Sequence, residues 1–453
     1  MIPARQLQSS VLPGARASAP SGVAASSRAL TALLTLLYMA LFHLIYSVQI
    51  SPAFAYMGYT LNPSISLGQW AVTALFAVLP LLFLRLDGAR PSNFIILLLY
   101  LLVYVPAQYM FTALDLTLHH VLLNRMVLLM GLAAMTAVSA RPMAVGFDRP
   151  VSAGVFRAVL ALLFASLFLG VASQFGFGLN LVGLFDVYDI RSEYKDEVGE
   201  AGRAFAYAVP YLGIVSAFMV GYGLIKRFFP FTLLGAFSLL YIFGTTGQKS
   251  TLFSLLLLIG VAVLYWLNPR KMGQNFVLLL TLFVGAVYVY DLWSRDILAS
   301  SLFVRRLILT PGLLTVYYLD FFSVNPPAQL GHSFLSSIFP YPYDLRPAFL
   351  IGREYFNAPS MSANANLFAD AYSNFREWGV LAFSVLLGGL LAFVDGYSRR
   401  LTTPVVVVTG LALPAFALTN SALFTSLLTH GLLFSVLLTY LYAASERDRN
   451  QSL

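Results

Sequence analysis

Cysteine is absent from the 453-residue chain, and charge is scarce. Without cysteine there is no disulfide framework, no thiolate nucleophile and no Cys-ligated zinc or iron–sulfur site. Only 10% of the residues are charged, whereas a soluble domain carries about 25%. The chain therefore has too little charge to cover a water-exposed surface, which excludes a cytosolic enzyme, a secreted domain and a disordered protein.

The chain instead contains long runs of apolar residues. Apolar residues make up 59% of the chain, and the mean hydropathy is +0.79. A helix that crosses a membrane needs about 20 apolar residues, and about twelve stretches reach that length. The runs are unbroken rather than alternating, so they predict an all-α polytopic membrane protein and not a transmembrane barrel. The predicted spans begin near Ala29, Gln69, Phe94, Val121, Ser152, Ala204, Phe228, Thr251, Asn275, Gly379, Pro404 and Ala422.

Lysine and arginine in the short turns set the predicted orientation. With both termini in the cytoplasm, every predicted cytoplasmic turn carries at least a basic pair. The net charge of +8 is then a topology signal, and no nucleic-acid partner is predicted. The expected divisions are a tail at 1–28, spans 1–5 at 29–174, a far-side loop at 175–203, spans 6–9 at 204–293, a large far-side loop at 294–378, spans 10–12 at 379–443 and a tail at 444–453.

The first far-side loop reads DVYDIRSEYKDEVGEAGR and has charges at helical spacing. Arg191 and Lys195 would share one helix face, and Glu193 and Glu197 another. Gly202 follows Arg191 by three helical turns on the same stripe, where a missing side chain would admit a bulky group. The pattern fits an anion-binding surface, and it fits a salt-bridged helix lying on the membrane at least as well.

The second far-side loop opens with LFVRRLILTPGLL. Arg305 and Arg306 are flanked by apolar residues that can lie in the membrane interface. Guanidinium groups bind phosphate bidentately and stay charged at any relevant pH, so a bilayer-facing diphosphate is a natural partner. The alternative is a pair of arginines that only reach out to lipid phosphates.

Further candidates lie around these two loops. Tyr341 and Tyr343 could stack on sugar rings or form an interfacial belt. Asn364, Asn366 and Asp370 suit hydroxyl-rich ligands, but helix capping near Ser362 or Asn364 would explain the amides without a ligand. The remaining candidates are Arg203, at the end of the first loop, and Lys249, in the turn FGTTGQKS, which could touch an anion or anchor the surface.

Metal and nucleotide motifs are missing from the sequence. There is no HExxH, no paired DxD and no phosphate-binding GxxxxGK[ST] loop, and no GxSxG. His119 and His120 are adjacent and cannot face the same way on a helix. We therefore predict no metal, no cofactor and no serine-hydrolase chemistry.

Several of these features coincide in one known family. They are about twelve spans, a far-side loop with R-x10-G, a larger loop that opens with a double arginine, and the runs FGTTGQKS and SMSANANLFADAY. In this combination the chain resembles the Wzy-type O-antigen polymerases of Gram-negative inner membranes. Arg191 with Gly202 matches the first R-x10-G pattern of that family. Arg305 matches the second arginine, but position 316 is valine, so the second glycine is missing.

The resemblance implies a metal-independent membrane glycosyltransferase of the GT-C type. It implies transfer of a glycan from undecaprenyl diphosphate to a hydroxyl of a new lipid-linked repeat unit, at the periplasmic face of the inner membrane. Its partners would be undecaprenyl-diphosphate-linked glycans and the bilayer, with a chain-length regulator left open. Arg191 and Arg305 would bind the donor or acceptor diphosphate, with Arg306, Lys195 and Arg203 in support. Base candidates are Glu193, Asp196, Glu197 and Asp370.

Three rival classes stay open on the sequence. An O-antigen ligase would move finished glycan to a lipid A core. A transporter or flippase would need ionisable residues deep in its spans, where only Arg125 and Arg157 are expected. A structural scaffold would leave the arginine pairs and the tyrosine-rich segment without a role.

Overall fold

A computed structural model describes residues 21–147, 151–178, 203–333, 336–399, 401 and 404–451. Every regular element in this part of the chain is a helix. The helices are α2 Ser21–Ile45, α3 Ser51–Phe54, α4 Leu67–Val78, α5 Pro91–Leu99, α6 Val105–Ala113, α7 Val121–Ser139, α8 Ala153–Phe175, α10 Arg203–Lys226, α11 Phe229–Thr246, α12 Lys249–Leu267, α13 Met272–Ser294, α14 Thr310–Val324, α15 Pro347–Phe356, α16 Leu367–Ser398, α17 Val405–Ala417, α18 Leu423–Leu428 and α19 Leu432–Gln451. Wider π-helical turns lie at Tyr46–Ile50, Tyr100–Tyr104 and Ser300–Leu309.

Ten helical segments in the described residues are long and apolar enough to cross a membrane. The all-α, polytopic class predicted from the sequence is thereby confirmed, with ten such segments rather than twelve. Nine of them lie where spans are predicted. The apolar helices at Leu67–Leu82, Phe253–Leu267 and Val405–Ala417 are shorter. The tenth segment, Ser300–Val324, lies inside the stretch predicted as the large loop 294–378.

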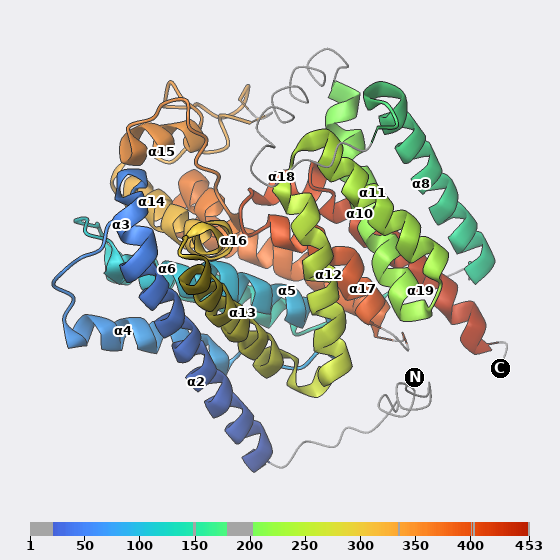
Figure 1. The fold of residues 1–453 in the computed structure, drawn as a ribbon, viewed down its shortest axis with the longest axis horizontal. Helices are drawn as coiled ribbons and strands as arrows, with labels where there is room; N and C mark the ends of the chain where they lie inside the picture. Colours follow the sequence, from blue (N-terminus) through green and yellow to red (C-terminus); the bar gives the residue numbers. More distant parts are fainter. Residues whose placement is uncertain are drawn as a thin grey trace.

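The continuous helix from Pro91 to Ala113 forms the centre of the fold. All of its residues are buried, and α14, α16 and α17 pack against it (Figure 1). Around it, α2 pairs with α13, α7 with α16, and α10 with α11. A helix that is apolar on every side needs other helices, not water, around it, which explains its central place.

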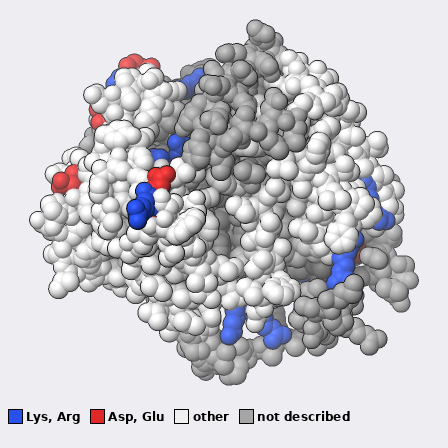
Figure 2. Space-filling model, in the orientation of Figure 1, with Lys and Arg blue, Asp and Glu red and all other residues white. Residues whose placement is uncertain are grey.

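Charged side chains are sparse on the visible face. Figure 2 shows Lys and Arg at the lower edge and the lower right, acidic and basic atoms together at the upper left, and a basic and an acidic side chain next to each other on the left of the face. Most of the remaining surface is free of charge. Large apolar side chains are exposed, among them Leu33, Leu162, Leu233 and Leu282. An apolar surface of this kind suits contact with lipid hydrocarbon.

The segment Ser300–Val324 does not run from one side of the bundle to the other. Near its start, Arg305 contacts Met57. Further along, Tyr317 donates a hydrogen bond to the Gly58 carbonyl, and Asp320 accepts one from the His119 N–H. Met57 and Gly58 follow α3, and His119 follows α6, so these contacts lie at one end of the bundle. We call this the α15 end; it is at the upper left of Figure 1. The segment therefore lies across that end, although it is long enough to span.

A close approach of backbones fixes α14 in this position. A Cβ atom on Gly312 would lie 2.6 Å from the Pro106 carbonyl carbon and 2.8 Å from the Ala107 nitrogen. We expect Gly312→Ala to destabilise the protein by about 1–3 kcal/mol because a backbone must shift. Gly170→Ala in α8 is the matched control, since its Cβ would meet nothing within 4 Å. Thermal unfolding in detergent checks this, and equal melting temperatures for the two variants would contradict the packing.

Candidate functional site

Arg305 lies in the π-helical turn and is only 6% exposed. Its guanidinium carbon is 4.1 Å from the centroid of the Phe54 ring and 5.8 Å from that of Tyr59. Its Nη2 and Nε donate hydrogen bonds to the Ser301 hydroxyl at 2.9 and 3.2 Å. The aromatic faces and one hydroxyl are neutral groups, so they hold the guanidinium in place without neutralising it.

The charge of Arg305 has no acidic partner in the described part of the chain. The salt bridges there involve His119, Lys226 and Arg353. A buried cation without a counter-ion is costly, because burial removes its hydration and no opposite charge offsets the loss. Binding an anion would remove that cost. Arg305 is therefore a candidate anion-binding residue.

Tyrosines hold the wall of this site in place. The Tyr59 hydroxyl shares a 2.7 Å hydrogen bond with Thr310, whose hydroxyl also bonds the Arg305 carbonyl. Gly58 has φ +76°, and a Cβ there would lie 2.6 Å from the Tyr317 hydroxyl, so glycine fits this turn. Burial raises the pKa of the Tyr59 hydroxyl, while its bond to Thr310 and the nearby Arg305 act in the opposite direction. Tyr59 thus stays neutral at physiological pH.

Arg306 is exposed, whereas Arg305 is buried. No ion pair in the described residues involves Arg306. An apolar groove of about 430 Å³ runs just before the pair, between α13 and the π-helical turn. Its walls include Phe283, Val287, Leu302 and Phe303. The arginine pair thus follows directly in the sequence on two residues, Leu302 and Phe303, that line an apolar groove.

Tyr341 and Tyr343 use their hydroxyls within the protein. Tyr341 donates to the Leu345 carbonyl, and Tyr343 donates to the Pro326 carbonyl. The two rings pack edge to face at 5.7 Å, and Tyr343 also packs on Phe322 at 6.0 Å. These contacts give both tyrosines a role in holding the loop between α14 and α15.

The two asparagines that were predicted to bind a ligand, Asn364 and Asn366, differ in burial and in hydrogen bonding. Asn366 is 1% exposed and caps α16, accepting from the Phe368 and Ala369 N–H groups, while its amide donates to Pro311 and Thr315. Every hydrogen-bonding atom of its side chain is thus used for structure. Asn364 is exposed and accepts from Ser362. The helix cap is therefore Asn366, not Ser362 or Asn364.

Asp370 is buried in the first turn of α16. Its Oδ1 accepts a 3.2 Å hydrogen bond from Asn374, and its Oδ2 has no hydrogen-bond partner in the described residues. Other predicted site residues cannot be placed. Arg191, Glu193, Lys195 and Glu197, together with Asp196 and Gly202, lie outside the described residues, as do the side chains of Arg203 and Lys249.

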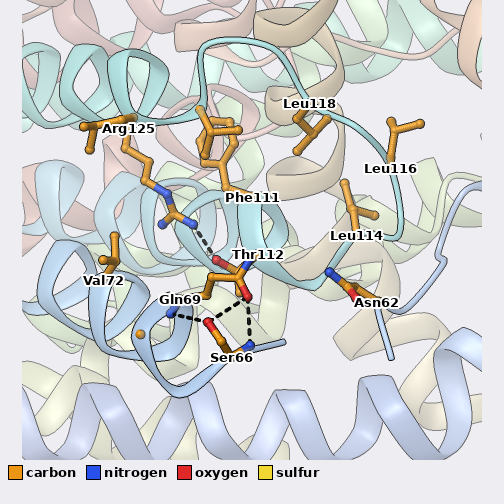
Figure 3. A pocket seen from close by; sticks show the side chains of 13 residues that line it. Asn62, Ser66, Gln69, Val72, Phe111, Thr112, Leu114, Leu116, Leu118 and Arg125 are labelled. Atoms are coloured by element: carbon orange, nitrogen blue, oxygen red, sulfur yellow. Dashed lines mark hydrogen bonds between the residues drawn. The ribbon is translucent and has the colours of Figure 1, made fainter. Parts of the chain in front are cut away.

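A second buried arginine lines a larger cavity at the α15 end. Arg125 is 3% exposed and donates to the Gln108 carbonyl and side chain, and to Thr73 and Thr112. Its guanidinium carbon lies 5.3 Å from the centroid of Phe111. Figure 3 shows the side chain reaching across the cavity wall toward Thr112. The cavity measures about 570 Å³. Because four of its N–H bonds are already made, Arg125 chiefly fastens α4, α6 and α7 together.

No feature of the sequence predicts the pairing of His119 with Asp320. The Nδ1 atom of His119 is 3.0 Å from Oδ1 of Asp320, and the Tyr355 hydroxyl donates to Oδ2 at 2.6 Å. The Tyr355 ring stacks on Tyr317 at 4.2 Å. No three His, Asp or Glu residues in the described residues are placed to hold a metal ion.

No family model, curated protein or solved structure matches the chain. The function is therefore inferred from the side chains and their surroundings. The structure brings Arg305 and Arg306 together with an apolar groove. Tyr341 and Tyr343 instead bond backbone carbonyls of the loop between α14 and α15, and Tyr343 packs on Phe322 of α14.

We expect Arg125→Ala to lower the free energy of unfolding by about 3 kcal/mol or more, because hydrogen bonds to a charged donor are worth about 1.5–3 kcal/mol each. Thermal unfolding in detergent measures the loss. Arg141→Ala is the matched control, since Arg141 is exposed and should change stability by no more than about 0.5 kcal/mol. An unchanged melting temperature for Arg125→Ala would contradict the fastening role.

Proposed function

We propose that the chain is a glycosyltransferase that polymerises undecaprenyl-diphosphate-linked oligosaccharide repeat units into an O-antigen polysaccharide. The observation that supports this best is the buried guanidinium of Arg305, which has no acidic partner in the described residues. A lipid-linked diphosphate supplies the missing negative charge. The likeness of the sequence to Wzy-type polymerases adds the reaction type.

The reaction needs cations at both lipid-linked substrates. The anomeric carbon of the growing glycan is attacked by a hydroxyl of a new repeat unit, and the bond to the donor diphosphate breaks. Positively charged groups that are already in place stabilise the departing diphosphate more than the ground state, which accelerates the step. A second positively charged side chain can bind the diphosphate of the acceptor. Arg305 suits either position, with Arg306 in support.

The groove beside the arginines suits the lipid part of such a substrate. Phe283, Val287, Leu302 and Phe303 line it, and Phe283 is 38% exposed. An isoprenoid chain entering from the bilayer would bury apolar surface there while its diphosphate stays near the arginines. Burial of that kind contributes about 25 cal/mol per Å². One molecule with an apolar tail and an anionic head therefore matches both halves of the site.

The proposed setting is the bacterial inner membrane, with the α15 end in the periplasm and both chain ends in the cytoplasm. The distribution of basic residues supports this orientation. The end of α10 and the turn after it carry Lys226 and Arg227, and the turn after α12 carries Arg270 and Lys271. Both turns lie away from the α15 end. Positive charge at helix ends favours the cytoplasmic side. A chain-length regulator is a further partner to be sought at the periplasmic face.

A transporter for the same lipid is the rival class. Buried carboxylates lie inside the candidate spans at Asp291, Asp320, Asp370 and Asp395. Two of them act as caps, because Asp291 accepts from the Ala299 N–H and Asp395 from the Ser92 N–H. Asp320 accepts from the His119 N–H and the Tyr355 hydroxyl, and Asp370 accepts from Asn374 and from the backbone of Leu423. The product of the purified protein separates the classes: a polymerase forms glycan ladders, a ligase needs a lipid A acceptor, and a transporter forms no product.

We expect Arg305→Ala to lower kcat/KM for a defined undecaprenyl-diphosphate repeat unit by about 100-fold, comparable with the loss of one charge-stabilising donor. Arg305→Lys should recover only part of the activity, because an ammonium cannot bind phosphate bidentately. Gel analysis of the glycan product gives the rate.

Arg346→Ala is the matched control for this measurement. Arg346 is exposed in the loop before α15, and its loss should leave the ladder of products unchanged. Wild-type-length ladders from Arg305→Ala would refute the assignment of Arg305. The absence of any product from the wild-type protein, with both donor and acceptor supplied, would refute the proposed function.

The orientation has its own test, because the chain contains no cysteine and a single introduced thiol reports its side. Tyr56 is 78% exposed at the α15 end, and Lys271 is exposed after α12. We expect a membrane-impermeant maleimide to label Tyr56→Cys in intact spheroplasts and Lys271→Cys only after lysis. The reverse pattern would invert the orientation and place the site in the cytoplasm.

A further inference from the structure

His119 lies outside the arginine site, and its ring has surroundings that suit a proton acceptor. It lies in the connection between α6 and α7, and its side chain is 52% exposed. Its Nδ1 is 3.0 Å from Oδ1 of Asp320, a carboxylate that is 5% exposed. The same Oδ1 accepts the His119 backbone N–H at 2.6 Å. Two bonds from one residue to one oxygen fix both the loop and the ring.

The Asp320 carboxylate determines which ring nitrogen of His119 is open. A carboxylate only accepts hydrogen bonds, so Nδ1 must carry the proton that it donates. In the neutral ring, Nε2 then has a lone pair and no proton. A histidine whose second nitrogen is held by a buried carboxylate is the usual arrangement of an enzymatic base.

Tyr355 completes the support of the carboxylate. Its hydroxyl donates to Oδ2 of Asp320 at 2.6 Å, and its ring stacks on Tyr317 at 4.2 Å. Burial and the bond to Asp320 raise the pKa of the Tyr355 hydroxyl, so the phenol keeps its proton and continues to donate. Asp320 therefore receives a hydrogen bond on each oxygen, and the open nitrogen of His119 is the part of the cluster left for a substrate.

We propose that His119 is the general base for the acceptor hydroxyl, with Asp320 and Tyr355 as positioning residues; this rests on the proposed function. The hydroxyl oxygen of the acceptor sugar forms a bond to the anomeric carbon of the donor. The bond from that carbon to the diphosphate oxygen breaks, and its electron pair leaves with the diphosphate. The hydroxyl proton passes to Nε2 of His119, and Asp320 stabilises the resulting imidazolium.

The position of His119 also assigns Arg305 to one substrate. Asp320 follows Arg305 by fifteen residues in one continuous helical segment, so that Arg305 and the Asp320–His119 pair lie at different points along it. Because Arg305 and this pair lie at different points of the segment, we assign them to different parts of the substrates. Arg305 then holds the diphosphate of the acceptor, and His119 meets the hydroxyl at the other end of the same oligosaccharide.

The test compares two adjacent histidines of one exposed loop. We expect His119→Asn to lower kcat by about 100-fold or more, within the range of general-base catalysis, with unchanged binding of the lipid-linked repeat unit. His120→Asn is the matched control, since His120 has φ 48°, which asparagine tolerates, and it should keep full activity. Added imidazole should restore part of the turnover of His119→Ala but none of that of Arg305→Ala.

The outcomes separate this inference from the proposed function. Normal kcat in His119→Asn, with ladders formed by the wild type and lost in Arg305→Ala, overturns His119 as the base and leaves the polymerase standing. A loss of activity that imidazole does not restore, together with weaker substrate binding, shows that His119 only fastens the loop and also overturns the inference. A wild type that forms no ladder overturns the function itself.

Discussion

One positive charge, held among neutral groups, is the feature on which the rest of the site depends. Arg305 is packed against Phe54 and Tyr59 and bonded to Ser301, and no carboxylate in the described residues pairs with it. A protein tolerates such an arrangement only when the surroundings fix it firmly. The packing of Gly312 on Pro106 and the hydrogen bond of Tyr317 to Gly58 provide that support. The fold thus keeps a cation available at one end of an apolar bundle.

Hydropathy predicted most of the helices because a lipid-facing or buried helix must be apolar along its length. It did not predict the place of Ser300–Val324, since two arginines and a Thr-Pro-Gly sequence are typical of a loop. Arg305 could enter a helix only because Met57, 248 residues away in the sequence, and its neighbours cover it. The membrane span was predicted to begin near Gly379, whereas the helix that contains it, α16, begins at Leu367, close to the cap expected at Ser362 or Asn364. The non-helical backbone at Phe375 and Arg376 lies just before the predicted start.

Candidate site residues could be chosen from the sequence only where the chemistry of the side chain is enough to choose them. A guanidinium binds phosphate wherever it stands, so Arg305 could be selected from its type and its neighbours. Whether a polar side chain is free or already bonded depends on distant partners. Asn366 is used as a cap with contacts to Pro311 and Thr315, and the hydroxyls of Tyr341 and Tyr343 bond backbone carbonyls. His119 and Asp320 are 201 residues apart, and no local pattern joins them.

The central claim is tested most directly by lipid affinity, without any reaction. Wild-type protein and Arg305→Ala in nanodiscs would be titrated with undecaprenyl diphosphate and with undecaprenol, which has the same tail and no charge. The account predicts that the wild type prefers the diphosphate by about tenfold or more, equivalent to about 1.4 kcal/mol, and that Arg305→Ala loses most of this preference. An equal preference in both proteins would contradict it, because the diphosphate would then be bound elsewhere.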